Sequence, residues 1–343
     1  MKKNIVFLSS LLFSLFLTFG LTTSTAVFAK TIKLNYSIFF PATHGQYKEA
    51  ALWAKEIEKR TGGRVKITLY PGGTLTSAPQ CYDGVVNGIS DIGMSVFAYT
   101  RGRFPVMEAC DLPLGYPDGK TATLVVNKFY QTFHPKELSD VKVLYLHAHG
   151  PGLLHTKKEV RKLEDLRGLK IRSTGLSAKI VKALGAVPVA MPQGQTYEAL
   201  KKGVVDGTFG PMEVLKGWRQ AEVIHYTIKD CGIGYTTTMF VVMNLKKWSK
   251  LPSDIKQVFE EVSKEWIPKH GEMWDSNDKE GEKYTLSLGN KIIELPNSEA
   301  EQWQKAVRKV INEYISNATK KGFDGNKYVE TLQNYIKSIT SEK

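Results

Sequence analysis

Residues 162–185 read KLEDLRGLKIRSTGLSAKIVKALG, and the order of patterns in this stretch decides the fold. Two apolar residues, Leu169 and Ile171, alternate with basic ones, which is the period-2 pattern of a strand with one buried face. A Ser-Thr-Gly turn follows, and residues 177–185 then read as a short helix that ends at a glycine. The stretch therefore predicts a strand–turn–helix unit with an arginine, Arg172, on the last residue of the strand.

Strand patterns and helix patterns also follow each other on both sides of this unit. They predict strands at 32–38, 64–70, 187–191 and 204–209, and helices at 46–60 and 195–203. The order strand–helix–strand builds a parallel sheet with right-handed crossovers. Residues 82–91 and 197–206 both follow the pattern Tyr-acid-x4-Gly-x2-Asp, with a helix expected to end at the glycine and a strand to start immediately before the aspartate. We interpret the two copies as two α/β lobes of similar construction.

The first 29 residues have the features of a cleaved secretory signal peptide. Lys2 and Lys3 are basic, an apolar run follows over 5–21, and Val27 and Ala29 place small residues at positions −3 and −1 of a cleavage site. A transmembrane anchor is the competing interpretation. Polar residues interrupt the apolar run, however, and a strand-like segment follows at once, so we expect export and cleavage.

Length and charge limit the classes of function. Without 29 of its 343 residues the chain keeps 314, which is too long for one ordinary core and suits two domains. Two lysines are lost with the leader, which leaves 45 basic and 34 acidic side chains and a net charge of +11. These charges are dispersed, whereas nucleic-acid binding requires a clustered basic face, so we expect no nucleic acid as a partner. A mild positive field favours anionic small molecules.

No enzyme or cofactor motif is found in the sequence. It lacks GxSxG, GxxxxGK[ST], HExxH and a GxGxxG that follows a strand, so we expect no catalytic residue and no cofactor. His147 and His149 lie two apart on a predicted strand near His155, which fits a metal site or an ordinary strand end, and we expect no metal. The three cysteines match no zinc or redox spacing, and one disulfide is compatible with them: Cys81, Cys110 and Cys231.

Arg172 is the residue with the clearest chemical meaning. In open α/β sheets, ligands bind outside the carboxyl ends of the strands, and a guanidinium there can hold a carboxylate through two parallel hydrogen bonds. The helix after Thr174-Gly175 would aim its N-terminal amides at the same crevice. On position alone, a surface or interdomain ion pair explains Arg172 better than a ligand does.

The order of the motifs resembles the solute-binding proteins of tripartite ATP-independent periplasmic (TRAP) transporters. The resemblance covers most of the mature chain. It is carried by LEDLRGLKIRSTG (163–175), VPVAMPQGQTYEALKKGVVDG (187–207), HGQYKEAALWAKEIEKRTGGRVKITLYPGGTL (44–75), NGISDIGMS (87–95) and Val242-Met243-Asn244.

The resemblance implies an α/β, two-lobed periplasmic binding protein fold. Each lobe would be a mostly parallel sheet flanked by helices, with hinge strands and a long C-terminal helical segment. We expect lobe I at 30–152 plus about 241–280, and lobe II with the C-terminal helices at 153–240 plus about 281–343. In the tail, Ser298 to Glu301 reads as a capping box that opens a helix.

The implied function is that of an extracytoplasmic receptor in the periplasm. It would bind a small organic acid between the lobes and deliver it to integral-membrane TRAP subunits, as a monomer and without catalysis. The carboxylate-gripping arginine of the family falls on Arg172. A further arginine of many members falls near Gly152, and their Glu-Asn-Pro is Phe209-Gly210-Pro211 here. Because two polar groups are lost, we predict a monocarboxylate with an apolar or aromatic body.

The sequence is also compatible with other ligands and with other classes of protein. They are a C4-dicarboxylate or other anionic solute, a receptor for another transporter or sensor, and a periplasmic enzyme.

Phe39 and His44 flank the end of the first strand and would face the crevice, or else serve as core residue and helix cap. Trp53 and Trp218 read as core. The candidate ligand-binding residues are Arg172, Phe209, Gly210, Phe39, His44, Ser95, Tyr99 and Tyr235, the last of them near a hinge.

Overall fold

The structure is a computed structural model that describes residues 31–229 and 231–342. The expected signal peptide at 1–29 lies outside the described residues. Among the helices described, none combines the length and the apolar character needed to cross a bilayer.

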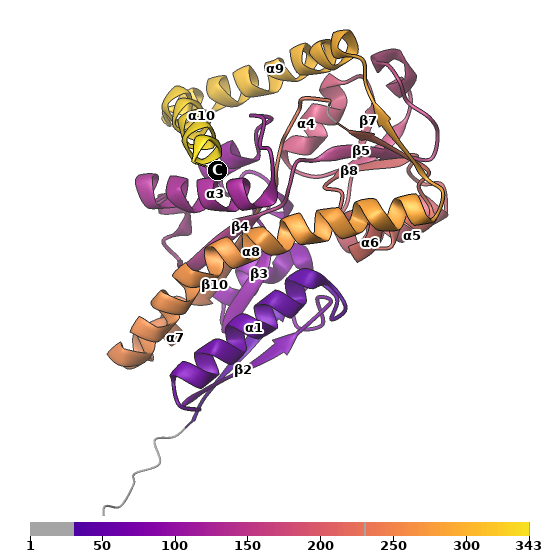
Figure 1. Cartoon of the computed structure of the whole chain (residues 1–343). Helices are drawn as coiled ribbons and strands as arrows, with labels where there is room; N and C mark the ends of the chain where they lie inside the picture. Colours follow the sequence, from indigo (N-terminus) through magenta and orange to yellow (C-terminus); the bar gives the residue numbers. More distant parts are fainter. Residues whose placement is uncertain (1–30, 230, 343) are drawn as a thin grey trace, which may run out of the picture. The chain divides into compact units, whose positions relative to one another are not determined.

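The first sheet has the strand order β2-β1-β3-β10-β4 (Figure 1). Its strands are β1 (Ile32–Ile38), β2 (Val65–Tyr70), β3 (Ile92–Val96), β4 (Val141–Ala148) and β10 (Thr238–Asn244). β1 pairs in parallel with β2 and β3, whereas β10 is antiparallel to β3 and β4. Long helices pack on this lobe, namely α1 (Gly45–Arg60), α3 (Gly119–Phe133) and the 35-residue α8 (Ser253–Ser287), and so do the short helices α2 (Cys81–Val86) and α7 (Leu245–Lys250).

The second sheet has the strand order β11-β9-β5-β8-β6-β7. Its strands are β5 (Leu153–Thr156), β6 (Lys170–Ser173), β7 (Val187–Ala190), β8 (Gly207–Gly210), β9 (Tyr226–Lys229) and β11 (Lys291–Glu294). β5 is antiparallel to its neighbours, and the other pairs are parallel. Its short helices are α4 (Leu176–Ala183), α5 (Thr196–Lys201) and α6 (Val214–Gly217). The expected two-lobed α/β fold is confirmed, with sheets that are mixed because β5 and β10 each follow a crossing between lobes.

The chain crosses between the sheets at two neighbouring linkers. One joins β4 to β5, the other joins β9 to β10, and the amide of Gly152 in the first donates to the carbonyl of Tyr235 in the second at 2.8 Å. α8 contacts α1 and α3 in the first lobe and α6 in the second, and Figure 1 shows it running along both. Two hydrogen-bonded linkers and one long helix therefore connect the lobes. The residue boundaries given for the lobes stay a prediction.

The C-terminal helices contact both lobes. α9 (Asn297–Lys320) packs on α4, and α10 (Gly325–Ser341) packs on α3 (Figure 1). The expected capping box is wrong: the N-cap of α9 is Pro296, without a side-chain cap, and Ser298 lies inside the first turn. The helix begins earlier than expected because Pro296 supplies the extended residue from which it starts.

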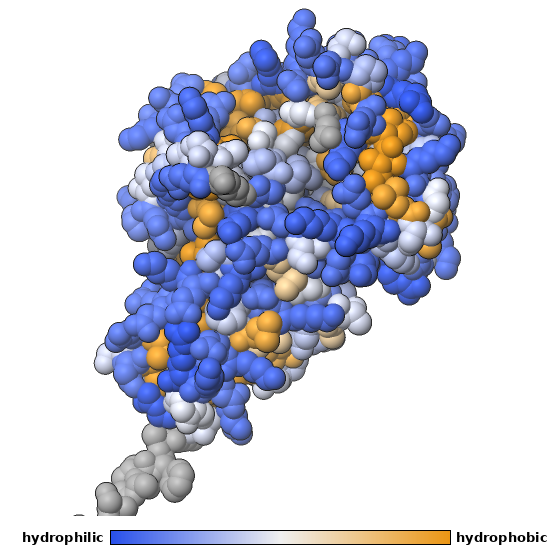
Figure 2. Space-filling model, viewed as in Figure 1, coloured by the Kyte–Doolittle hydropathy of each residue, from blue (hydrophilic) through white to orange (hydrophobic). Residues whose placement is uncertain are grey.

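The ends of the predicted elements shift by up to three residues. β6 extends to Ser173, so Arg172 is its penultimate residue rather than its last. β3 and β8 begin after Asp91 and Asp206, not before them. The predicted core position Trp53 is fully buried. Figure 2 shows that the face along α8 is largely hydrophilic, in keeping with a helix that buries one side only.

Candidate ligand-binding site

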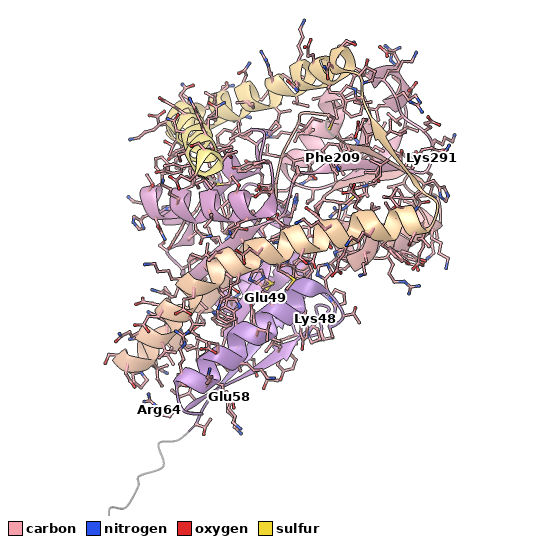
Figure 3. The ribbon with its side chains drawn as sticks, viewed as in Figure 1. Lys48, Glu49, Glu58, Arg64, Phe209 and Lys291 are labelled. Atoms are coloured by element: carbon pink, nitrogen blue, oxygen red, sulfur yellow. The ribbon has the colours of Figure 1, made fainter. Side chains whose placement is uncertain are left out.

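A small cavity lies between elements of the two lobes. The volume of this cavity is about 40 Å³. Six of the eight predicted residues line it: Arg172 on β6, Phe209 and Gly210 on β8, Phe39 after β1, Tyr99 after β3, and Tyr235 before β10. Figure 3 labels Phe209 within the second lobe. Residues far apart in sequence thus converge because the carboxyl ends of several strands meet here.

Arg172 is buried at the wall of this cavity. Its side chain is 4% exposed, and its Nε and Nη2 atoms donate to the carbonyl of Met191 at 3.1 and 3.0 Å. No acidic side chain among the described residues forms an ion pair with it. A buried guanidinium without a counter-charge is costly, because a single carbonyl satisfies only part of its five donors. The site is therefore chemically suited to an anion.

The expected help from the N-terminus of α4 is limited. The amide of Ser177 already donates to the carbonyl of Thr174 at 3.0 Å, and the amide of Ala178 donates to Gly175 at 3.3 Å. Two of the first amides of this helix are therefore used within the turn itself. Of the two attractions for an anion expected from the sequence, the charge of Arg172 therefore has more support than the helix terminus.

Aromatic rings form much of the remaining wall. Phe209 and Tyr235 stack with ring centroids 5.0 Å apart and planes 18° from parallel. On the other side, Phe39 stacks with Trp218 at 6.1 Å and meets Tyr99 edge-on at 5.9 Å. Such walls favour a flat apolar body through stacking and through the removal of apolar surface from water.

Gly152 explains how Tyr235 reaches the cavity. A Cβ atom at position 152 would lie 1.8 Å from Cε1 of Tyr235, so the ring occupies the space that a side chain there would need. This is the position near which the family resemblance places a second arginine. The ring of Tyr235 leaves no room for a side chain at position 152. At this point the cavity wall is therefore aromatic, not cationic.

Two titratable side chains near Arg172, those of His149 and Tyr235, are neutral at physiological pH. Burial lowers the pKa of His149 to about 4, assisted by the charge of Arg172, although its hydrogen bond to the Gly150 carbonyl at 2.5 Å acts in the opposite direction. Burial also raises the pKa of the Tyr235 phenol. Neither group competes with a carboxylate for the guanidinium at neutral pH.

Two hydrogen bonds join the lobes beside the cavity. His44, which precedes α1, contacts Glu213 with 2.9 Å between Nε2 and Oε2, and both side chains are buried. The amide of Gln193 donates to the Tyr99 hydroxyl at 3.0 Å. These contacts pair residues of the first lobe with residues of the second, so they form only when the lobes are close together.

The other two predicted residues lie outside the cavity wall. Ser95 is fully buried, and its hydroxyl donates to the carbonyl of Ala78 at 2.7 Å. His44 accepts from the amide of Gln46 at Nδ1, so it caps α1, and it contacts Glu213 at Nε2. Its predicted alternatives, helix cap and crevice residue, are therefore combined: the imidazole caps a helix and borders the site.

Sequence reasoning missed several residues of the wall. Trp218, predicted as core, lines the cavity, as do Trp274, Gln193 and Glu213. The Nε2 atom of Gln193 and the Nε1 atom of Trp218 are buried and have no hydrogen-bond partner among the described residues. The sequence did contain a signal for Gln193. This residue comes shortly after the end of β7, and a position close to a strand end is the same signal that identified Arg172 on β6. The spacing of Trp218 carried no such signal.

The neighbouring histidines have separate structural roles. His147 stacks on His270 with centroids 4.2 Å apart and accepts from Nε1 of Trp274 at 3.0 Å. His155 lies in the second sheet, where Nε2 contacts the carbonyls of Gly210 and Pro211 at 3.1 and 3.2 Å. His155 thereby orients the end of β8, which forms part of the cavity wall.

Comparison with known proteins finds relatives that match most of the chain. The chain is 26% identical over 289 residues to a monocarboxylate 2-oxoacid-binding periplasmic protein of Nostoc, covering 79% of this chain and 76% of the relative. A TRAP solute-binding protein of Rhodoferax ferrireducens, solved with copurified benzoate, is 28% identical with a TM-score of 0.86, covering 91% of this chain and 99% of the other. A marine-metagenome TRAP protein specific for aromatic acids, solved with 3-hydroxybenzoate, is 29% identical with a TM-score of 0.86, at coverages of 90% and 99%.

The family model of the bacterial extracellular solute-binding proteins, family 7 (DctP), matches residues 36–317. This span includes both sheets, except for the first four residues of β1, and every residue of the cavity wall discussed above. The chain therefore belongs to family 7 of the bacterial extracellular solute-binding proteins, the solute-receptor components of TRAP transporters.

Proposed function

We propose that this protein is a periplasmic receptor for a monocarboxylate with an aromatic or apolar body. It binds the acid between its lobes, with Arg172 on the carboxylate, and presents the closed form to integral-membrane TRAP subunits without altering the ligand chemically. The observation that carries the proposal is the buried Arg172 guanidinium, which has no acidic partner among the described residues and faces aromatic walls.

The size of the cavity requires the lobes to open before a ligand can enter. Ligand pockets of small-molecule receptors have volumes of roughly 300–1,000 Å³, whereas the space between these walls is about 40 Å³. An aromatic acid therefore enters when the lobes separate and the rings of Phe209, Tyr235 and Trp218 move outward. Contacts such as His44–Glu213 then favour the closed form once the carboxylate compensates Arg172.

Isothermal titration calorimetry across a ligand panel tests the proposal. The panel contains benzoate, 3-hydroxybenzoate, mandelate, a short 2-oxoacid, succinate and sialic acid. We expect the aromatic monocarboxylates to bind more tightly than succinate and sialic acid. Tighter binding of succinate would contradict the aromatic preference, and binding of none of these acids would contradict the assignment of ligand class.

Substitution of Arg172 tests the role of the guanidinium. Removing one partner of a buried charge pair costs about 2–5 kcal/mol, so Arg172→Ala should weaken benzoate binding by more than about thirtyfold. Arg167→Ala is the matched control, because Arg167 is exposed and lies in the turn before the same strand. Equal affinities of wild type and Arg172→Ala would exclude Arg172 as the carboxylate clamp. Mass spectrometry of the recovered ligand should show it unchanged.

A further inference from the structure

Two open clefts flank the closed cavity. The first cleft has a volume of about 580 Å³ and lies between the loop after β3 and helix α4. It adjoins the cavity directly, since Ala98 and Leu176 line the cleft while their neighbours Tyr99 and Ser177 line the cavity. At this boundary the lobes touch: a Cβ atom on Gly175 would lie 2.7 Å from Cβ of Ala98. Separation of the lobes at this contact joins cleft and cavity.

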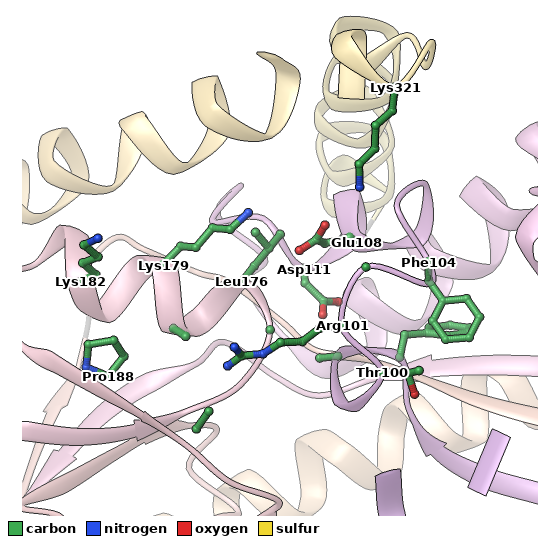
Figure 4. Close-up of a pocket in the computed structure, with 16 residues that line it drawn as sticks. Thr100, Arg101, Phe104, Glu108, Asp111, Leu176, Lys179, Lys182, Pro188 and Lys321 are labelled. Carbon is green, nitrogen blue, oxygen red and sulfur yellow. The ribbon is translucent and has the colours of Figure 1, made fainter. Parts of the chain in front are cut away.

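The first cleft is strongly cationic. Arg101, Lys179, Lys182 and Lys321 line it, and none of the four forms an ion pair among the described residues. Figure 4 shows these side chains arranged around one space, carried by the loop after β3, by α4 and by the end of α9. They come from three separate chain segments, so this concentration of charge exists only in the folded protein.

The acidic groups of this cleft offset little of that charge. Glu108 and Asp111 are the two acids of its wall. Burial raises the pKa of Asp111 to about 8, so this group is mostly protonated at neutral pH. Four basic side chains therefore line this cleft against two acidic ones, and burial keeps one of these acids, Asp111, mostly protonated. Lys321 also attracts Glu137, without forming a contact ion pair among the described residues.

The second cleft differs in its electrostatics. It has a volume of about 770 Å³ and shares Trp218 and Glu213 with the cavity. Its cations are largely paired, since Lys216 contacts Glu280 at 2.9 Å and Arg219 contacts Glu222 at 2.7 Å. Lys48 has no ion pair among the described residues, so one of the three Lys and Arg side chains of this cleft is uncompensated, against all four in the first cleft.

We propose that the first cleft is an electrostatic entry vestibule, through which small carboxylate anions are drawn to Arg172 before the lobes close. This inference rests on the proposed function and adds the route and the rate of ligand capture. A cleft lined by charge of one sign concentrates counter-ions and raises association rates by about 10- to 10³-fold. Charges at a rim act mainly on the association rate and leave the dissociation rate nearly unchanged.

The test is stopped-flow binding of benzoate, read by intrinsic tryptophan fluorescence, because Trp218 and Trp274 line the cavity. The variant Lys179→Glu/Lys182→Glu reverses two charges in the first cleft. The variant Lys48→Glu/Lys216→Glu makes the same change of net charge in the second cleft. Thermal melts check that both variants fold, and Lys179→Gln/Lys182→Gln removes the charges without reversing them.

At low ionic strength, we expect the first variant to lower the association rate constant by at least about tenfold and to leave the dissociation rate constant within about twofold. The second variant should have a clearly smaller effect. The difference should vanish in about 1 M salt, where the Debye length is about 3 Å. The neutral glutamine variant should be intermediate.

Each other outcome overturns the inference. Equal slowing in both variants would show a general effect of net charge, and faster dissociation alone would show that the lysines contact the bound ligand. A calorimetric stoichiometry of two benzoates per chain would replace the vestibule by a second binding site. Titration of the wild-type protein tests the proposed receptor function separately. If wild type binds benzoate and the two charge-reversal variants behave alike, only the vestibule is excluded. If wild type binds none of the panel, both proposals fall.

Discussion

The ring of Tyr235 stacks on the ring of Phe209, with centroids 5.0 Å apart and planes 18° from parallel. Tyr235 lies in the linker between β9 and β10, and Phe209 belongs to β8 of the second lobe. One aromatic pair thus connects a linker between the lobes with the wall of the cavity. We infer that a change of the angle between the lobes would repack this pair and so alter the shape of the proposed site.

Gly152→Ala should destabilise the protein and weaken ligand binding. The new methyl group would lie 1.8 Å from the Tyr235 ring, and overpacking of this kind costs about 1–3 kcal/mol. Urea unfolding and benzoate calorimetry measure the two effects. Gly194→Ala is the control, since its nearest contact would be an ordinary 3.8 Å to Trp218. If the ring causes the loss, Gly152→Ala/Tyr235→Leu should recover part of the stability lost in the single variant.

Phe209→Leu should reduce the preference of the protein for aromatic acids over aliphatic ones. An aromatic pair contributes about 0.5–1.5 kcal/mol beyond its buried area, so benzoate affinity should fall by about threefold to tenfold. Butyrate, which cannot stack, should bind as it does to wild type. Phe129→Leu, at a buried aromatic position of α3 outside the cavity wall, controls for general destabilisation. Equal losses for benzoate and butyrate would contradict the role of stacking.

Glu213→Ala should favour the open form. In the closed form the buried His44 would lose its partner at 2.9 Å, whereas in separated lobes water can replace it. An unsatisfied buried group costs about 1–3 kcal/mol, so ligand affinity should fall by about 5- to 150-fold. Small-angle scattering with saturating ligand should show whether closure is still complete.

The surface pair Lys216–Glu280 is the control for this experiment. Its side chains are about half exposed, and such pairs contribute about 0–1 kcal/mol. Glu280→Ala should therefore leave affinity nearly unchanged. A similar loss in both variants would show that removal of negative charge, rather than loss of a contact between lobes, is responsible.

Asp111→Asn should flatten the pH dependence of stability. Burial raises the pKa of Asp111 from 3.8 to about 8, while hydrogen bonds from the amide and hydroxyl of Thr238 act in the opposite direction. Between these pH values the folded state binds more protons than the unfolded state, so wild-type stability falls as pH rises. Below pH 3.8 both states are protonated and the penalty is absent.

Urea unfolding of wild type and Asp111→Asn at pH 5 and pH 8 measures this difference. The raised pKa of Glu137, about 7, is present in both proteins and cancels in the comparison. The asparagine oxygen can still accept the hydrogen bonds of Thr238. Between pH 5 and pH 8, the free energy of unfolding should fall less for Asp111→Asn than for wild type. Equal falls in the two proteins would show that Asp111 is ionised in the folded state over this whole range.

Much of the fold could be predicted because its signals are local. The period-2 pattern of 32–38 and the apolar face of 46–60 depend on neighbouring residues, and both elements form with bounds within one residue of those expected. The capping box at Ser298 failed because a local motif competed with Pro296 two residues earlier. The mixed strand directions also escaped prediction, since they depend on where the chain crosses between lobes.

The strands, the helices and the placement of Arg172 near a strand end follow from local sequence, because periodicity and strand-end geometry are short-range properties. The packing of distant segments is what brings Trp218 to the cavity, Glu213 to His44, and Lys179 and Lys321 to one cleft. These residues come from distant segments and different lobes. Their distances are set by how the lobes pack and close, and no spacing along the chain encodes that arrangement.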